Sequence, residues 1–195
     1  VLALSDKLGF TSSGKNSHDV SLFWNEQIHL ELHYTTVEEG RAVNASSILS
    51  NIWNYAYLQS ESRYMLRDEM FYFYHIAHMA KHIENGGCGV RPFLDLYILN
   101  HNMEYDQEKR DELLKLGGLT KFECVAQNLS EYWLSDAKPD DVSAELEAYI
   151  LKGGSYGSVD NHLAVQSTRK GSKRKYISSR LFMPYDTLKC RYPVL

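Results

Sequence analysis

The chain has 195 residues, of which 44% are hydrophobic and 12% aromatic, which excludes a disordered protein and allows one domain or two small lobes. Its formal net charge of −4 argues against a nucleic-acid binder. Basic side chains nevertheless gather in residues 166–195, which we expect to form a solvated basic tail.

The three cysteines, Cys88, Cys124 and Cys190, form no Cys-x-x-Cys pair, so a disulfide scaffold or a zinc–thiolate site is not expected. No apolar run approaches the roughly 20 residues that span a bilayer, and no signal segment opens the chain. We therefore expect a cytoplasmic protein that does not enter a membrane. Because Val1 lies inside a predicted helix, we also expect the sequence to be a fragment.

The first part of the chain predicts a short helix and a β-hairpin. Apolar spacing predicts a helix over residues 2–8, and the polar residues 11–16 are expected to form a turn. Strands are predicted over residues 20–24 and 28–34, joined by a tight turn. The second strand alternates strictly, so its polar face carries His29, Glu31 and His33.

Beyond Ala45 the periodicity is helical. The first helix is predicted over residues 46–58, and the second runs from a cap at Ser60 or Ser62 to residue 83. Four more helices are predicted over residues 93–99, 106–116, 119–133 and 139–151. Two short helices are predicted at residues 175–182 and 184–188. The predicted fold class is α+β and predominantly helical, a β-hairpin packed on a helical bundle. We expect three domains: an αβ part (1–44), a helical domain (45–157) and a basic loop with a helical tail (158–195).

One predicted helix carries three histidines, His75, His78 and His82, at positions i, i+3 and i+7. These positions share a face, but the outer two lie about 10 Å apart along the axis, so one ion could take an adjacent pair at most. We expect His78 and His82 to be mainly structural and to hydrogen-bond with residues 91–95. A metal-dependent hydrolase built on this helix is one alternative, and it requires carboxylates near His78 and His82.

Three charged residues near that helix, Lys81, Arg91 and Asp95, predict an ion-pair network or an anion site. Lysine and arginine both suit phosphate recognition, as a mobile point charge and as a planar fork. The glycines of residues 151–157 follow a helix instead of opening one, which is the wrong polarity for a phosphate loop. We therefore expect them to form a helix stop.

Glu31 is the other candidate residue. A carboxylate at the centre of an apolar strand is costly unless its face is wet or functional. A solvated outer face of the hairpin and a functional site both fit the spacing equally well.

Five segments taken in order resemble the motifs of one family. They are residues 6–10, 28–34, 78–82 with 91–95, 149–157, and 179–184 with 191–193. Their succession resembles the poorly characterised bacterial nucleotidyltransferase family of the polymerase-β-like superfamily, over nearly the whole chain.

This resemblance implies that Glu31 is a catalytic, metal-binding acid and that Lys81 or Arg91 binds the phosphates of a nucleotide. His78, His82 and Asp95 would support that site. The implied reaction is in-line transfer of a nucleotidyl group from a nucleoside triphosphate to an unknown acceptor hydroxyl, with Mg2+ as cofactor.

The sequence departs from the family at one point. Enzymes of this superfamily use a Gly-Ser turn followed by Asp-x-Asp, and these 195 residues contain no such combination. We expect it upstream of Val1, so that this chain is incomplete or inactive by itself. The main alternative is a non-catalytic helical binding module, and an exposed hairpin edge would favour a homodimer.

Overall fold

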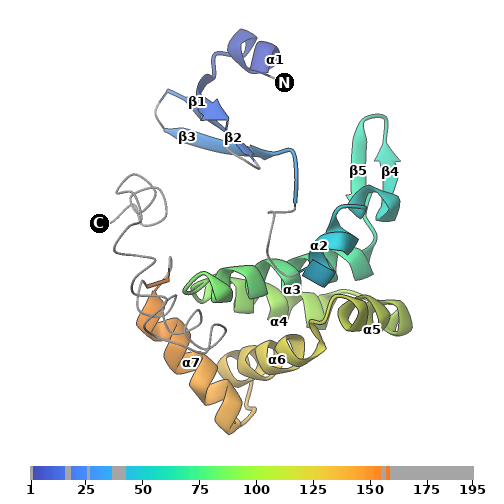
Figure 1. Ribbon diagram of the computed structural model, residues 1–195, viewed down its shortest axis with the longest axis vertical. Coiled ribbons are helices and arrows are strands. Elements are labelled where there is room, and N and C mark those ends of the chain that lie inside the picture. Colours follow the sequence, from blue (N-terminus) through green and yellow to red (C-terminus); the bar gives the residue numbers. More distant parts are fainter. Residues whose placement is uncertain (1, 16–18, 26, 37–42, 155–156, 159–195) are drawn as a thin grey trace. The chain divides into compact units, whose positions relative to one another are not determined.

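The computed structural model describes residues 2–15, 19–25, 27–36, 43–154 and 157–158. Among these residues it forms seven α-helices, one 3-10 helix and five strands, so the predicted class, α+β and predominantly helical, is confirmed (Figure 1). The chain divides into two compact units, Val1–Arg67 and Asp68–Leu195, which are described separately below. The packing of the hairpin on the helices and the three predicted domains stay predictions.

The first unit opens with a short helix and a three-stranded antiparallel sheet. These elements are α1 (Leu2–Lys7), β1 (Thr11–Lys15), β2 (Asp19–Trp24) and β3 (Ile28–His33), with the strand order β1-β2-β3. The predicted hairpin of β2 and β3 is confirmed, and Asn25 in its turn has a positive φ of 51°. Within the described residues β3 pairs with β2 alone, so it is an edge strand, and dimerisation through it stays a prediction.

The expected turn at residues 11–16 is wrong, because residues 11–15 are strand β1. Its sequence Thr-Ser-Ser-Gly-Lys has no apolar alternation, so no side-chain pattern marks it as a strand. The strand forms through backbone pairing with β2, in which Thr11 faces Phe23 and Ser12 faces Leu22. Backbone hydrogen bonds carry no sequence signature, which explains the difference.

A second hairpin replaces part of the predicted helices. The chain forms α2 (Val43–Leu49), a 3-10 turn η1 (Ile52–Tyr55), and strands β4 (Ala56–Ser60) and β5 (Arg63–Leu66). The helix predicted over residues 46–58 is therefore wrong beyond Leu49, and the next helix begins at Asp68 instead of near Ser60. Trp53, which the helical pattern placed on an apolar face, is 74% exposed, and the aromatic residues after it suit a pleated ribbon.

The second unit consists of five described helices. They are α3 (Asp68–Glu84), α4 (Arg91–Asn102), α5 (Gln107–Leu116), α6 (Thr120–Leu134) and α7 (Asp141–Gly153). All five agree with the predicted helices of this region, apart from the start of α3. Their ends follow local chemistry, because Asp106 accepts a hydrogen bond from the Lys109 amide and Asp140 from the Ser143 amide.

Large apolar side chains form the core of this unit. Fully buried examples on four of the helices are Phe73, Ile76, Met79, Phe93, Leu96, Leu129 and Ile150. Two polar bonds also join the helices, one between buried residues and one between half-buried residues. The Tyr72 hydroxyl donates to Glu123 Oε1 at 2.7 Å between α3 and α6, and the Trp133 indole N–H donates to Glu147 Oε1 at 2.7 Å between α6 and α7.

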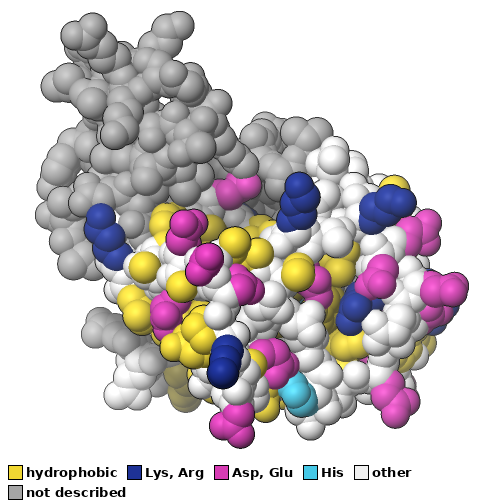
Figure 2. Space-filling view, turned by 90° about the horizontal axis from the view of Figure 1, so that it is seen from below, with side chains coloured by type: hydrophobic (Ala, Val, Ile, Leu, Met, Phe, Trp, Pro, Cys, Tyr) yellow, Lys and Arg dark blue, Asp and Glu magenta, His cyan; other side chains and the backbone are white. Residues whose placement is uncertain are grey.

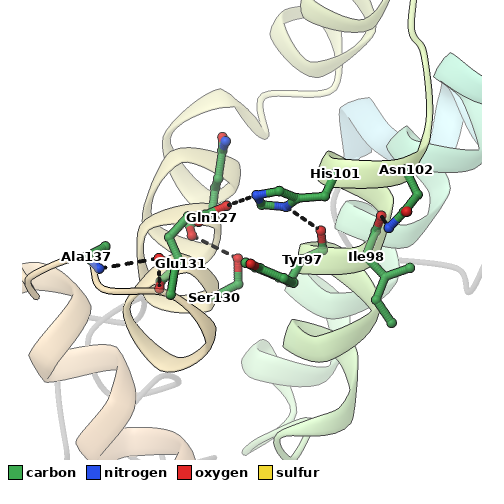
Figure 3. A network of polar contacts seen from close by, with 9 residues as sticks. Tyr97, Ile98, His101, Asn102, Gln127, Ser130, Glu131 and Ala137 are labelled. Carbon is green, nitrogen blue, oxygen red and sulfur yellow. Dashed lines mark hydrogen bonds and ion pairs between the residues drawn. The ribbon is translucent and has the colours of Figure 1, made fainter.

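Polar contacts also tie α4 to α6 nearer the surface. His101 bonds through Nδ1 to the Tyr97 carbonyl at 2.9 Å, and its Nε2 lies 3.7 Å from Glu131 Oε1 on α6 (Figure 3). The face shown in Figure 2 mixes acidic, basic and hydrophobic side chains. Such a mixed surface offers no field of a single sign to an approaching polyanion.

The expectations for residues 159–195, including the two short helices, the basic tail and Cys190, lie outside the described residues. Among the helices that are described, none is long and apolar enough to cross a membrane.

Candidate functional site

Glu31 lies in the middle of β3, between two histidines of the same strand face. Its Oε1 is 3.8 Å from His29 Nε2, and its Oε2 is 3.7 Å from His33 Nε2. The Glu31 side chain is 52% exposed, so solvent reaches it and burial does not penalise its charge. His29 is held by stacking on Phe23 of β2, with ring centroids 4.6 Å apart. The arrangement presents a hydrated carboxylate whose two oxygens each face an imidazole.

The register of the sheet places a second carboxylate on this face. Ser21 of β2 is opposite Glu31, and Asp19 is opposite His33, so Asp19 and Glu31 are diagonal neighbours on adjacent strands. Asp19 is buried, at 5% exposure. Sequence reasoning did not bring the two together, although the alternation of both strands contained the signal.

The three histidines of α3 do not contact one common point. His78 and His82 face each other, with their Nε2 atoms 2.9 Å apart, and Tyr74 lies against the His78 ring. His75 turns instead toward α4, where its Nε2 lies 2.9 Å from the Pro92 carbonyl oxygen. Of the three histidines, His75 thus contacts the start of α4. The predicted hydrogen bonds of His78 and His82 with residues 91–95 stay a prediction.

The two predicted phosphate-binding residues lie at the ends of successive helices. Lys81 is in the last turn of α3, half-buried, and Arg91 is the first residue of α4, after the intervening residues 85–90. Arg91 Nε lies 3.9 Å from Asp95 Oδ2, one turn along the helix, and the Arg91 side chain is 89% exposed. An exposed ion pair of this kind contributes little stability. Because the Arg91 side chain is so exposed, its guanidinium remains accessible to an anion.

Glycines fix the path of the chain between α3 and α4. A side chain at Gly157 would place its Cβ 2.5 Å from the Gly86 carbonyl carbon, and one at Gly87 would meet Gly157 Cα at 2.9 Å. The Ser158 amide also donates to the Gly86 carbonyl at 3.2 Å. Gly157 therefore serves close packing against the segment after α3, and the expectation that Gly153 and Gly154 stop a helix is confirmed, because α7 ends at Gly153.

Cys88 lies between these glycines and α4. Burial raises the pKa of its thiol to about 12, so at neutral pH it is protonated and a poor nucleophile. Its Sγ lies 3.6 Å from the Gly89 carbonyl oxygen. The sulfur is thus part of the packing of this loop.

No group of three or more His, Cys, Asp or Glu side chains among the described residues could hold a metal ion. The hydrolase alternative needs carboxylates beside His78 and His82, and the described residues supply no such group. The carboxylates of Glu31 and Asp19 likewise do not form a complete metal site.

Comparison with known proteins gave one match. The sequence model of a protein family described as uncharacterised nucleotidyltransferase matches residues 2–135. No curated protein and no solved structure matches the chain. The match includes β3 with Glu31, the end of α3 and the start of α4, and it ends at α6.

Proposed function

Because the chain belongs to the uncharacterised nucleotidyltransferase family, we propose that it takes part in the transfer of a nucleotidyl group from a nucleoside triphosphate to an acceptor hydroxyl. The observation that carries this proposal is the family match over residues 2–135, more than half of the chain. The geometry adds one supporting fact: Glu31, the acid that the family resemblance points to, is hydrated and lies on a polar sheet face with Asp19.

In this proposal Glu31 supplies one carboxylate to the reaction centre. Each of its two oxygens lies within 3.8 Å of an imidazole of the same strand, His29 on one side and His33 on the other. Asp19, the diagonal neighbour, adds negative charge to the same face. His29 and His33 would stabilise the carboxylate further when they are protonated.

Magnesium is the ion that stabilises triphosphate charge in reactions of this kind. The described residues do not fit a two-metal site, because Glu31 and Asp19 form no group of three with another ligand. The printed sequence also contains no Gly-Ser turn followed by Asp-x-Asp. We therefore derive no catalytic step through the metal, and we expect these 195 residues alone to transfer no nucleotide.

Lys81 and Arg91 are the proposed phosphate-binding residues. They belong to one compact unit, at the end of α3 and the start of α4, so both cations are held by the same helical frame. The packing of Gly86 and Gly87 against Gly157 and the bond from His75 to Pro92 fix how α4 begins. Exposed cations attract a triphosphate mainly by charge, so binding should weaken as salt rises.

The experiment is a titration of the chain with a labelled triphosphate, by equilibrium dialysis at low and high salt. Lys81→Met and Arg91→Gln should each weaken binding, whereas Lys115→Met, in the last turn of α5, should leave it unchanged. Equal binding by all variants would overturn the assignment of the phosphate site.

A pyrophosphate-release assay with magnesium tests the reaction itself. We expect no turnover by this chain. Turnover that Glu31→Gln abolishes would support nucleotidyl transfer but contradict the view that further carboxylates are needed, and Asp6 and Asp19 would then be examined as ligands. Turnover unaffected by Glu31→Gln would overturn the role of Glu31.

A second candidate is a non-catalytic binding module. The lack of an Asp-x-Asp strand in the printed sequence favours it. The absence of any triphosphate binding by the chain, together with an intact fold, would favour this candidate over the first.

A further inference from the structure

The histidine pair of α3 has a geometry that the nucleotidyltransferase proposal does not use. His78 and His82 are one turn apart, and each directs the same atom, Nε2, at the other, with 2.9 Å between the two nitrogens. Their ring centroids are 4.5 Å apart and the ring planes meet at 62°. Two ligand atoms of one type thus converge on one point of a regular helix.

The two nitrogens are within hydrogen-bonding distance of each other. In a pair of neutral imidazoles, one Nε2 carries hydrogen and donates it to the lone pair of the other. If the donor ring held its proton on Nδ1 instead, both Nε2 lone pairs would point into the space between the rings. The Nε2 of a neutral imidazole is among the commonest metal ligands in proteins.

The separation of the nitrogens indicates which ions fit. Two nitrogens bound at 2.0–2.1 Å and at right angles lie about 2.9 Å apart, whereas tetrahedral coordination separates them by about 3.4 Å. The observed 2.9 Å is the length of the hydrogen bond between the two rings, and it is close to the separation of neighbouring ligands on a square-planar or octahedral ion, so the rings would move little to take up that geometry. Among divalent ions with nitrogen ligands, Cu2+ and Ni2+ prefer such geometry.

We propose that His78 and His82 form a two-nitrogen binding site for a divalent transition-metal ion, Ni2+ or Cu2+. The pair lies toward the end of α3, and His82 is in its last turn, where the helix dipole favours a cation. Both residues are half-buried, which limits the freedom of the rings. No third His, Cys, Asp or Glu completes a group with this pair among the described residues.

This site is independent of nucleotidyl transfer. Magnesium in that reaction is bound by carboxylate oxygens, whereas this site offers imidazole nitrogens, which magnesium disfavours. A test with metal alone therefore does not depend on whether the chain binds a nucleotide.

The experiment is calorimetric titration of the 195-residue chain with NiCl2, repeated with ZnCl2. We expect one Ni2+ site that binds more tightly than Zn2+. Because each ring supplies half of the chelate, His78→Ala and His82→Ala should each lower the Ni2+ affinity roughly tenfold or more. His101→Ala, a half-exposed histidine on α4, is the matched control and should leave it unchanged.

Three results would overturn the proposal: no Ni2+ binding by the unaltered chain, unchanged affinity in both α3 variants, or an equal loss in the His101 control. If an alanine variant fails to fold, an NMR titration of the unaltered chain with Ni2+ still tests the site. Added Ni2+ should then broaden the imidazole NMR signals of His78 and His82 before those of His75 and His101, and equal broadening of all four would contradict the site.

Discussion

Tyr72 on α3 and Glu123 on α6 form a buried hydrogen bond, in which the tyrosine hydroxyl donates to the carboxylate at 2.7 Å. Tyr72 is fully buried and Glu123 is 7% exposed. The Arg110 guanidinium of α5 lies over the Tyr72 ring, 5.3 Å from its centroid, and Tyr105 packs edge-on against the same ring. The pair thus joins α3 and α6, and Arg110 adds a contact from α5, so three helices of the second unit meet at this buried polar contact.

Removing the hydroxyl should destabilise this unit. Tyr72→Phe leaves the Glu123 carboxylate buried without that donor, at a cost of about 1–3 kcal/mol in the free energy of unfolding, measured by urea denaturation. The double variant Tyr72→Phe/Glu123→Met should lose less than the single one, because no polar group is left unpaired. A double variant as unstable as the sum of the two single variants would contradict this account.

The same cluster predicts an alkaline limit to stability. Burial raises the pKa of Tyr105 to about 12, an effect that Arg110 opposes and Asp68 reinforces, and burial together with the bond to Glu123 raises the pKa of Tyr72. Both hydroxyls ionise near pH 10 in the unfolded chain, so above pH 10 the unfolded state binds fewer protons. The contribution of these two tyrosines to the free energy of unfolding should be constant below pH 10 and fall between about pH 10 and 12.

The measurement is the free energy of unfolding at pH 9, 10 and 11. Tyr105→Phe should lower stability at pH 9, because the Tyr105 hydroxyl donates to the Leu99 carbonyl at 3.0 Å. It should also flatten the decline above pH 10. Tyr132→Phe, on the half-exposed side of α6, is the control, and a flattened decline in that variant as well would show that the cluster is not the cause.

The bounds of α5 and α7 were predictable because particular residues mark their ends. Asp106 and Asp140 cap the starts of α5 and α7, and Gly117 and Gly154 follow their ends. The hairpin of β4 and β5 was not, because apolar residues from Ile48 to Ala56 happen to recur at helical intervals. Sequence spacing records which residues are apolar, not which of them are buried.

The candidate site was predictable to the level of faces and no further. Alternation along β3 placed His29 and His33 beside Glu31, as found. The bonds of the α3 histidines depend on rotamers set by neighbouring helices, so the link from His75 to Pro92 could not be read from spacing. The buried Glu123 did leave a signal, since it shares a helical face with Ala126 and Ser130, both fully buried.

Cys88 and Cys124 should differ strongly in reactivity. The Cys88 thiol, with a pKa raised to about 12 by burial, is almost wholly protonated at pH 8, whereas Cys124 is exposed on α6. Iodoacetamide at pH 8 should therefore modify the Cys124 peptide well before the Cys88 peptide, as followed by mass spectrometry. Denaturant should remove the difference. Fast modification of Cys88 in the folded chain would contradict its burial in the loop.

The contact between the ends of α3 and α7 can be tested with alanine substitutions at two glycines. Gly157 and Gly154 both have a positive φ, 77° and 59°, and Gly154 also has a ψ of −160°, so alanine strains the backbone at both positions.

Only Gly157→Ala also produces a clash, with Gly86, because nothing lies within 4 Å of a Cβ at Gly154. Both substitutions should lower the melting temperature, but only Gly157→Ala adds the clash to the backbone strain. Gly157→Ala should also remove the hydrogen-exchange protection of the Ser158 amide, which bonds to the Gly86 carbonyl, while Gly154→Ala keeps it. Equal protection of the Ser158 amide in the two variants would mean that backbone strain, and not close packing of the two segments, explains the glycine at position 157.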